Sequence, residues 1–188
     1  ELNEAFNYFK SESVSELVLD LRYNGGGDVR MAVDLASMIT GQFPGQVFMK
    51  EQWNAKYQEF YESKHPDFLL NKFNTTLPSG SLINSLHLER VFILTTHSTA
   101  SASELIINGL NPYIDVVHIG DVTTGKFQAS SVLYDAPAPN YRKEDIYTGV
   151  SHYYALQPLV LKSSNVDGVS DYVNGLNPDI KVVEDVLN

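Results

Sequence analysis

Residues 91–110 read VFILTTHSTASASELIINGL, which is an apolar run, a turn of small polar residues and a second apolar run. The first run, Val91 to Thr95, has the length and composition of a buried strand, and the second has those of a helix. The same order occurs earlier, where a strand over Leu17–Leu21 precedes glycines and a helix near Val29–Thr40. Repeated strand, turn and helix units predict an α/β layer fold.

The rest of the chain adds elements of both kinds. Leu2, Ala5, Phe6 and Phe9 recur at helical spacing. Strands are predicted over 116–120, near 130–134, near 155–162 and near 180–183. Residues 50–88 are rich in aromatic side chains and have mixed periodicity, so we predict a helix plus a loop there.

Composition limits the classes of function. The chain has 188 residues, of which 43% are hydrophobic, and this is enough for one sizeable core. A net charge of -10 argues against nucleic acid and anionic membranes as partners. Without cysteine there is no disulfide and no thiol nucleophile. The histidines lack a zinc-ligand spacing, and no apolar run reaches the roughly 18 residues of a membrane span.

Ser101 is the candidate nucleophile because it stands at a predicted strand-to-helix turn. Such turns expose a side chain and point helix N-terminal amides toward it. The amide of Ala102 is then placed to stabilise an oxyanion. An ordinary helix cap is the alternative, since serines followed by Glu104 also fit capping chemistry.

Three strings decide between these interpretations: DLRYNGGG at 20–27, STASASE at 98–104 and GDVTTGK at 120–126. In order and spacing they resemble the C-terminal processing, or tail-specific, serine peptidase family. The resemblance implies a layered, crotonase-like or ClpP-like catalytic core with a Ser-Lys dyad. Ser101 would be the nucleophile that forms an acyl-enzyme, and Lys126, 25 residues later, its general base.

The resemblance also implies how the dyad is supported. One oxyanion donor would be the backbone of Gly27, with Gly26 as second choice, and the other the amide of Ala102. A lysine accepts a proton only when neutral, and free lysine has a pKa of about 10.4. We therefore expect Lys126 to be buried, within hydrogen-bond reach of Ser101, and activity to rise with pH.

The residue that orients Lys126 stays open. Many family members have glutamine four residues after the lysine, where this chain has Ser130. Gln128 and Ser130 would share the face of Lys126 in an extended segment, and register puts Ser130 first. Gln157 is a third candidate. Asp20 and Arg22 are interpreted as structural.

Taken together, residues 1–188 are predicted to be one peptidase catalytic domain, N-terminally truncated, with 50–88 a possible lining of the substrate groove. The resemblance implies polypeptide substrates with apolar C-terminal residues, a PDZ domain and signal upstream, and an exported protein of the periplasm or cell envelope. It implies no cofactor and no metal.

Gly120–Lys126 also resembles a phosphate loop, but Phe127 replaces the required Ser or Thr. A catalytically inactive ligand- or peptide-binding module on the same fold is the alternative.

Overall fold

A parallel four-stranded sheet forms one half of the protein in the computed structural model, which describes residues 1–137, 141–147, 152 and 154–184. Its strand order is β1-β4-β5-β10, and every neighbouring pair is parallel. The strands are β1 (Val18–Asp20), β4 (Arg90–Thr95), β5 (Asp115–Gly120) and β10 (Ile180–Lys181). Helices lie in the connections from β1 to β4 and from β4 to β5, so the predicted α/β fold class is confirmed.

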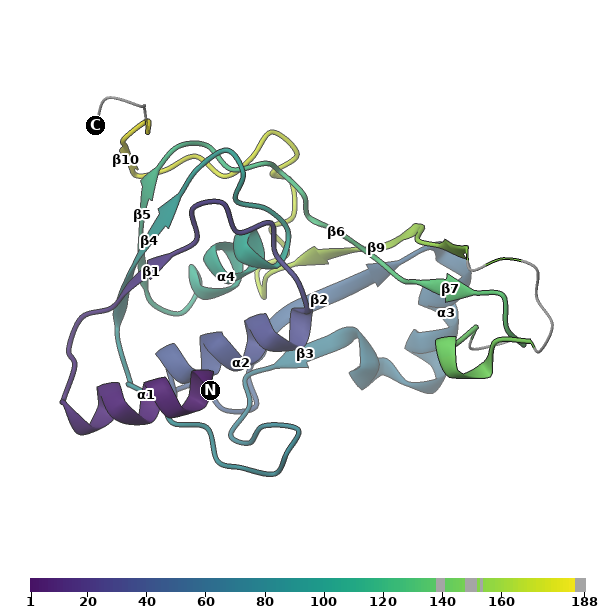
Figure 1. The fold of residues 1–188 in the computed structure, drawn as a ribbon, viewed down its shortest axis with the longest axis horizontal. Helices are drawn as coiled ribbons and strands as arrows, with labels where there is room; N and C mark the ends of the chain where they lie inside the picture. The colour runs from purple at the N-terminus through teal and green to yellow at the C-terminus, as the bar shows by residue number, and fades with distance from the viewer. Residues whose placement is uncertain (138–140, 148–151, 153, 185–188) are drawn as a thin grey trace.

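An antiparallel sheet forms the second half, in the order β3-β2-β9-β6. It consists of β2 (Val47–Trp53), β3 (Leu70–Lys72), β6 (Gln128–Ser130) and β9 (Leu159–Ser164). Figure 1 shows this sheet extending away from the parallel one, toward the far end of the molecule. The expectation of a helix plus a loop over 50–88 was incomplete, because β2 and β3 occupy part of that segment.

Four α-helices complete the described framework: α1 (Leu2–Ser11), α2 (Val29–Ile39), α3 (Ala55–Lys64) and α4 (Ala102–Leu110). Figure 1 shows α4 between the two sheets, and α3 at the far end of β2. Asp28 caps α2 by accepting a hydrogen bond from the Arg30 amide at 2.8 Å. The smaller elements are the 3₁₀ helices η1 (Pro66–Leu69) and η2 (Lys143–Asp145) and the strand pair β7 (Leu133–Tyr134) and β8 (Ala155–Leu156).

The hydrophobic core lies where α2 and α4 pack against each other and against β2 and β4. Met38, Phe48, Ile93 and Leu110 are at most 1% exposed. Since every residue of α4 is buried, this helix holds its N-terminus in a fixed place. The core therefore supports the turn that carries Ser101.

Most predicted elements agree with the structure to within two residues, including β1, α2, β4 and β5. The two long segments predicted near 130–134 and 155–162 are each divided in two. Pro158 separates β8 from β9, because proline cannot donate a ladder hydrogen bond. No helix in the described part of the chain has the length and apolar character needed to cross a bilayer.

Candidate active site

Ser101 stands at the turn between β4 and α4, as predicted, in a strained backbone conformation. Its φ is 59° and its ψ is −118°, a region that residues with a side chain rarely occupy. Ser101 and Glu104 also form a capping box at the start of α4, which confirms the helix-cap interpretation. A capping role is compatible with the nucleophile interpretation, which stays a prediction. Strain of this kind persists only where the surroundings enforce it, and it concentrates at functional sites.

The glycine turn lies directly against the Ser101 backbone. A Cβ on Gly26, where φ is +93°, would come within 2.7 Å of Ala100 O, Ala102 N and Ser101 Cβ. Only glycine permits this approach. The Gly26 amide donates to Asn24 Oδ1 at 3.0 Å, whereas the amides of Gly27 and Ala102 have no hydrogen-bond partner among the described residues.

Asn24 joins the glycine turn (residues 24–27) to the turn that carries Ser101, the candidate nucleophile turn (residues 96–101). Its backbone oxygen accepts from the Ala100 amide at 3.1 Å, and its Oδ1 accepts from Ser103 Oγ at 3.0 Å. The glycine turn and the start of α4 are therefore held together on both sides of Ser101.

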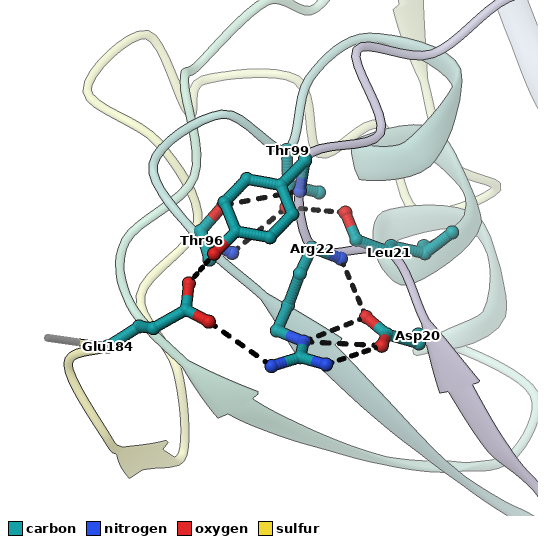
Figure 2. Close-up of polar contacts among 7 residues, drawn as sticks. Asp20, Leu21, Arg22, Thr96, Thr99 and Glu184 are labelled. Carbon is teal, nitrogen blue, oxygen red and sulfur yellow. Dashed lines mark hydrogen bonds and ion pairs between the residues drawn. The ribbon is translucent and has the colours of Figure 1, made fainter. Parts of the chain in front are cut away.

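Figure 2 shows a second set of bonds, which ties residues 20–23 to Thr99 and to Glu184. Thr99 Oγ1 donates to the backbone oxygen of Leu21 at 2.8 Å. Arg22 lies between Asp20, at 2.8 Å, and Glu184, at 3.3 Å, and Tyr23 also donates to Glu184. The Arg22 hydrogen bond lowers the pKa of the Asp20 carboxyl. These contacts support the structural roles expected for Asp20 and Arg22.

Glu104 links the nucleophile turn to the loop that carries Lys126. Its carboxylate is completely buried. Oε2 accepts from the amides of Ser101 and Lys126, both at 2.8 Å. Oε1 accepts from the Gly125 amide at 2.6 Å and from Thr123 Oγ1 at 2.5 Å. Sequence reasoning considered Glu104 only as a helix cap and missed this link, for which the capping pattern is the only sequence signal.

Lys126 differs from the expectation, since its side chain is exposed rather than buried. The physical reason is that Glu104 holds its backbone amide, while no described residue forms a hydrogen bond or ion pair with its amine. Among the described residues, no hydrogen bond joins Ser101 Oγ to Lys126 Nζ. Catalytic hydrogen bonds are often long before substrate binds.

The three candidates for orienting Lys126 fall in two places. Gln128 lines a pocket together with Ser101 and Lys126. Ser130 instead accepts a hydrogen bond from Gln157 Nε2 at 2.9 Å, and neither residue lines that pocket. The register argument that put Ser130 first assumed a regular strand, but the pairing of β6 with β9 shifts between Ala129 and Ser130.

The pocket beside Ser101 is lined mainly by apolar side chains from both halves of the protein. Met49 comes from β2, Leu105 from α4 and Leu161 from β9. Its polar lining residues are Glu51, Ser101, Lys126, Gln128 and Ser163. A second pocket, lined by Gly26, Gly27, Met31 and Ile106, shares Ala102 with the first. Within the described segments, no three His, Asp or Glu side chains gather as a possible metal site.

A strained serine at a strand-to-helix turn, unpaired amides beside it and a lysine in the same pocket are the features of a serine hydrolase site. The sequence model of peptidase family S41 matches residues 1–182. The chain therefore belongs to peptidase family S41, and the resemblance noted from its sequence is confirmed. Comparison with curated protein sequences found no match.

Solved structures show the same fold. A candidate S41 protease from Bacteroides fragilis is 30% identical with a TM-score of 0.73, and the match covers 97% of this chain and 41% of that one. The photosystem II D1 C-terminal processing protease is 21% identical with a TM-score of 0.64, covering 100% and 39%. A lipoprotein from Streptococcus agalactiae is 18% identical with a TM-score of 0.54, covering 96% and 57%. The chain thus spans about two fifths of the length of the first two.

Proposed function

We propose that this chain is the catalytic part of a serine endopeptidase that cleaves polypeptides near their C-termini with a Ser101–Lys126 dyad. The observation that carries the proposal is the shared anchor, because the backbone amides of both residues bind the same oxygen of Glu104. Both side chains also line one pocket. The family match adds support from the sequence.

The dyad would work by covalent catalysis. Lys126, neutral, takes the proton of the Ser101 hydroxyl while the oxygen attacks a peptide carbonyl. The tetrahedral intermediate then collapses to an acyl-enzyme, and Lys126 gives the proton to the leaving amine. Water hydrolyses the ester in the second half of the cycle. A peptide lying over the pocket would cover the exposed Lys126 and remove water from it.

The oxyanion would be stabilised by the amides of Gly27 and Ala102. Both lack a partner among the described residues and so are free to donate. Gly26 is the weaker candidate because its amide already binds Asn24. Instead, Gly26 allows the turn to approach Ser101 closely.

Gln128 is the best-supported candidate for orienting Lys126, because it lies two residues further along and lines the same pocket. Ser130 and Gln157 bind each other and would contribute less. Delivery of the substrate by an upstream PDZ domain, and export to the cell envelope, complete the proposal and rest on family membership alone.

Active-site labelling tests the dyad. The protein would be treated with a fluorophosphonate that carries a reporter, and the labelling rate compared with those of Ser101→Ala and Lys126→Ala. We expect no adduct on Ser101→Ala and a rate about 10³-fold lower for Lys126→Ala. Gln128→Ala should cost about tenfold, and Ser130→Ala should cost less.

Mass spectrometry of the labelled peptide provides the control, since the adduct must map to residue 101. Equal labelling of all these variants would reject the dyad. It would leave an inactive peptide-binding module on the same fold as the remaining interpretation.

A further inference from the structure

Glu51 is the one acidic side chain among the described residues that line the pocket beside Ser101. It belongs to β2, where it follows the fully buried Met49 on the same face of the strand. Met49 contributes to the apolar part of the pocket, and Glu51 adds a half-buried carboxylate next to it. A purely apolar substrate side chain would leave this carboxylate without a partner of opposite charge.

The carboxylate is held in place by two neutral donors. Trp53 Nε1 donates to Oε2 and Asn71 Nδ2 donates to Oε1, each at 2.9 Å. No lysine, arginine or histidine of the described residues forms an ion pair with Glu51. A carboxylate oxygen accepts more than one hydrogen bond, so Glu51 keeps capacity for a further donor. It is an oriented negative charge that lacks a cation.

The Trp53 ring that donates to Glu51 belongs to a cluster of aromatic side chains. Trp53 packs against Tyr61, with ring centroids 5.4 Å apart, and Tyr61 stacks on Phe68 at 4.5 Å. Burial raises the pKa of Tyr61, and the nearby Tyr57 and Glu51 raise it further. Cations bind favourably next to aromatic faces as well as to carboxylates.

We infer that the pocket selects a lysine or arginine side chain of the peptide substrate, with Glu51 as the residue that determines this specificity. The inference deepens the proposed function and rests on it. Such a side chain has an apolar stem and a cationic end. The stem would lie along the partly exposed Phe127 and Leu161, and the cation would reach Glu51. The net charge of -10 would favour the approach of basic peptides.

Lys126 lines the same pocket, so an alternative role for Glu51 must be separated from this one. Glu51 could in principle act on the lysine rather than on the substrate. No ion pair within 4.0 Å joins the two residues in the described structure. An experiment that measures binding without catalysis distinguishes the two roles.

The test uses peptides and Trp53, which is the only tryptophan in the chain and is hydrogen-bonded to Glu51. Two blocked alanine-rich peptides would be titrated into the Ser101→Ala protein, one with a single central lysine and one with norleucine there. Trp53 fluorescence would report binding. We expect the lysine peptide to bind about tenfold more tightly. With Glu51→Gln added, the preference should fall below about twofold, mainly through weaker lysine binding.

Glu59→Gln is the matched control, because it removes one negative charge from an exposed position of α3 outside the pocket. It should keep the tenfold preference. Three results with the Ser101→Ala protein would overturn the inference, whether or not the Glu51 variant folds. They are equal affinity for the two peptides, tighter binding of the norleucine peptide, and no binding of either. An equal loss of both peptides in Glu51→Gln would overturn it too. Ser101-dependent labelling of the unsubstituted protein would still support the proposed function in each case.

Discussion

The turn that carries the proposed nucleophile Ser101 (the nucleophile side) and the loop that carries the proposed base Lys126 (the base side) are built in opposite ways. Ser101 belongs to a turn whose neighbours Thr99, Ala100 and Ala102 are buried and whose backbone is bonded to the glycine turn and to Glu104. Lys126 has a backbone that is fixed equally well by Glu104, but its side chain is exposed. We infer from the difference that the protein fixes the turn of the proposed nucleophile before substrate binds. For the proposed base it fixes only the backbone, and a bound peptide would have to desolvate the amine.

The largest effect that would test this comparison comes from Gly26→Ala. The new methyl group would meet Ala100 O, Ala102 N and Ser101 Cβ at 2.7 Å, at a φ of +93°. The turn must therefore shift, which displaces Ser101 and the oxyanion donors. We expect fluorophosphonate labelling to slow about 10³-fold.

Gly25→Ala is the control for that variant, because a Cβ there meets no atom within 4 Å. It should label at nearly the normal rate. If Gly26→Ala labels as fast as Gly25→Ala, the nucleophile turn is not held by the close approach of the glycines. The contrast between the two sides of the site would then be wrong.

Glu104→Ala should have the next largest effect, and it sharpens the comparison because it releases both sides at once. Three amides and one hydroxyl would lose a buried acceptor. We expect labelling of the folded protein to slow about 10²-fold and the free energy of unfolding to fall by about 3 kcal/mol. Urea denaturation and labelling kinetics would measure the two effects.

The matched control is Asp34→Asn. Asp34 is another buried acid, but it lies on α2 and accepts a hydrogen bond from Asn74 Nδ2 at 2.7 Å, away from the site. It should lower stability without slowing the labelling of folded protein. A Glu104→Ala protein that loses only stability would show that the shared anchor has no part in positioning the dyad.

Much of the nucleophile side could be predicted from sequence because its signals are local. The run from β4 through Ser101 to α4 combines apolar periodicity with a turn of small residues, and the bounds of β4 were predicted within one residue. The second sheet was not predicted, because β2 pairs with β9, more than 100 residues later. Its polar residues, Lys50 to Gln52, also obscure the strand pattern.

The base side could be predicted only in part, because its geometry depends on contacts between segments that are far apart in the sequence. The motif identified Lys126, but its exposure depends on what packs over the loop, which no local pattern encodes. The shift in register between Ala129 and Ser130 likewise depends on the partner strand β9. Glu51 carried no local signal, since its place in the pocket follows from the pairing of β2 with β9.

The smallest predicted effect concerns Tyr172, which packs against Phe127 behind the base loop with ring centroids 5.6 Å apart. Its hydroxyl is buried without a hydrogen-bond partner among the described residues, and burial raises its pKa to about 12. Below pH 10 the hydroxyl is neutral in both states, so it makes no pH-dependent contribution. Above pH 10 the unfolded chain loses the proton first, which lowers the stability of the folded state.

The free energy of unfolding of the protein should therefore fall relative to that of Tyr172→Phe as the pH rises from 10 toward 12, by about 1 kcal/mol at pH 11. Urea denaturation of both proteins at pH 8 and pH 11 would measure the difference, and the other tyrosines cancel in the comparison. Parallel behaviour at both pH values would mean that Tyr172 is accessible to water, so that the backbone of the base loop is less firmly supported than the nucleophile turn.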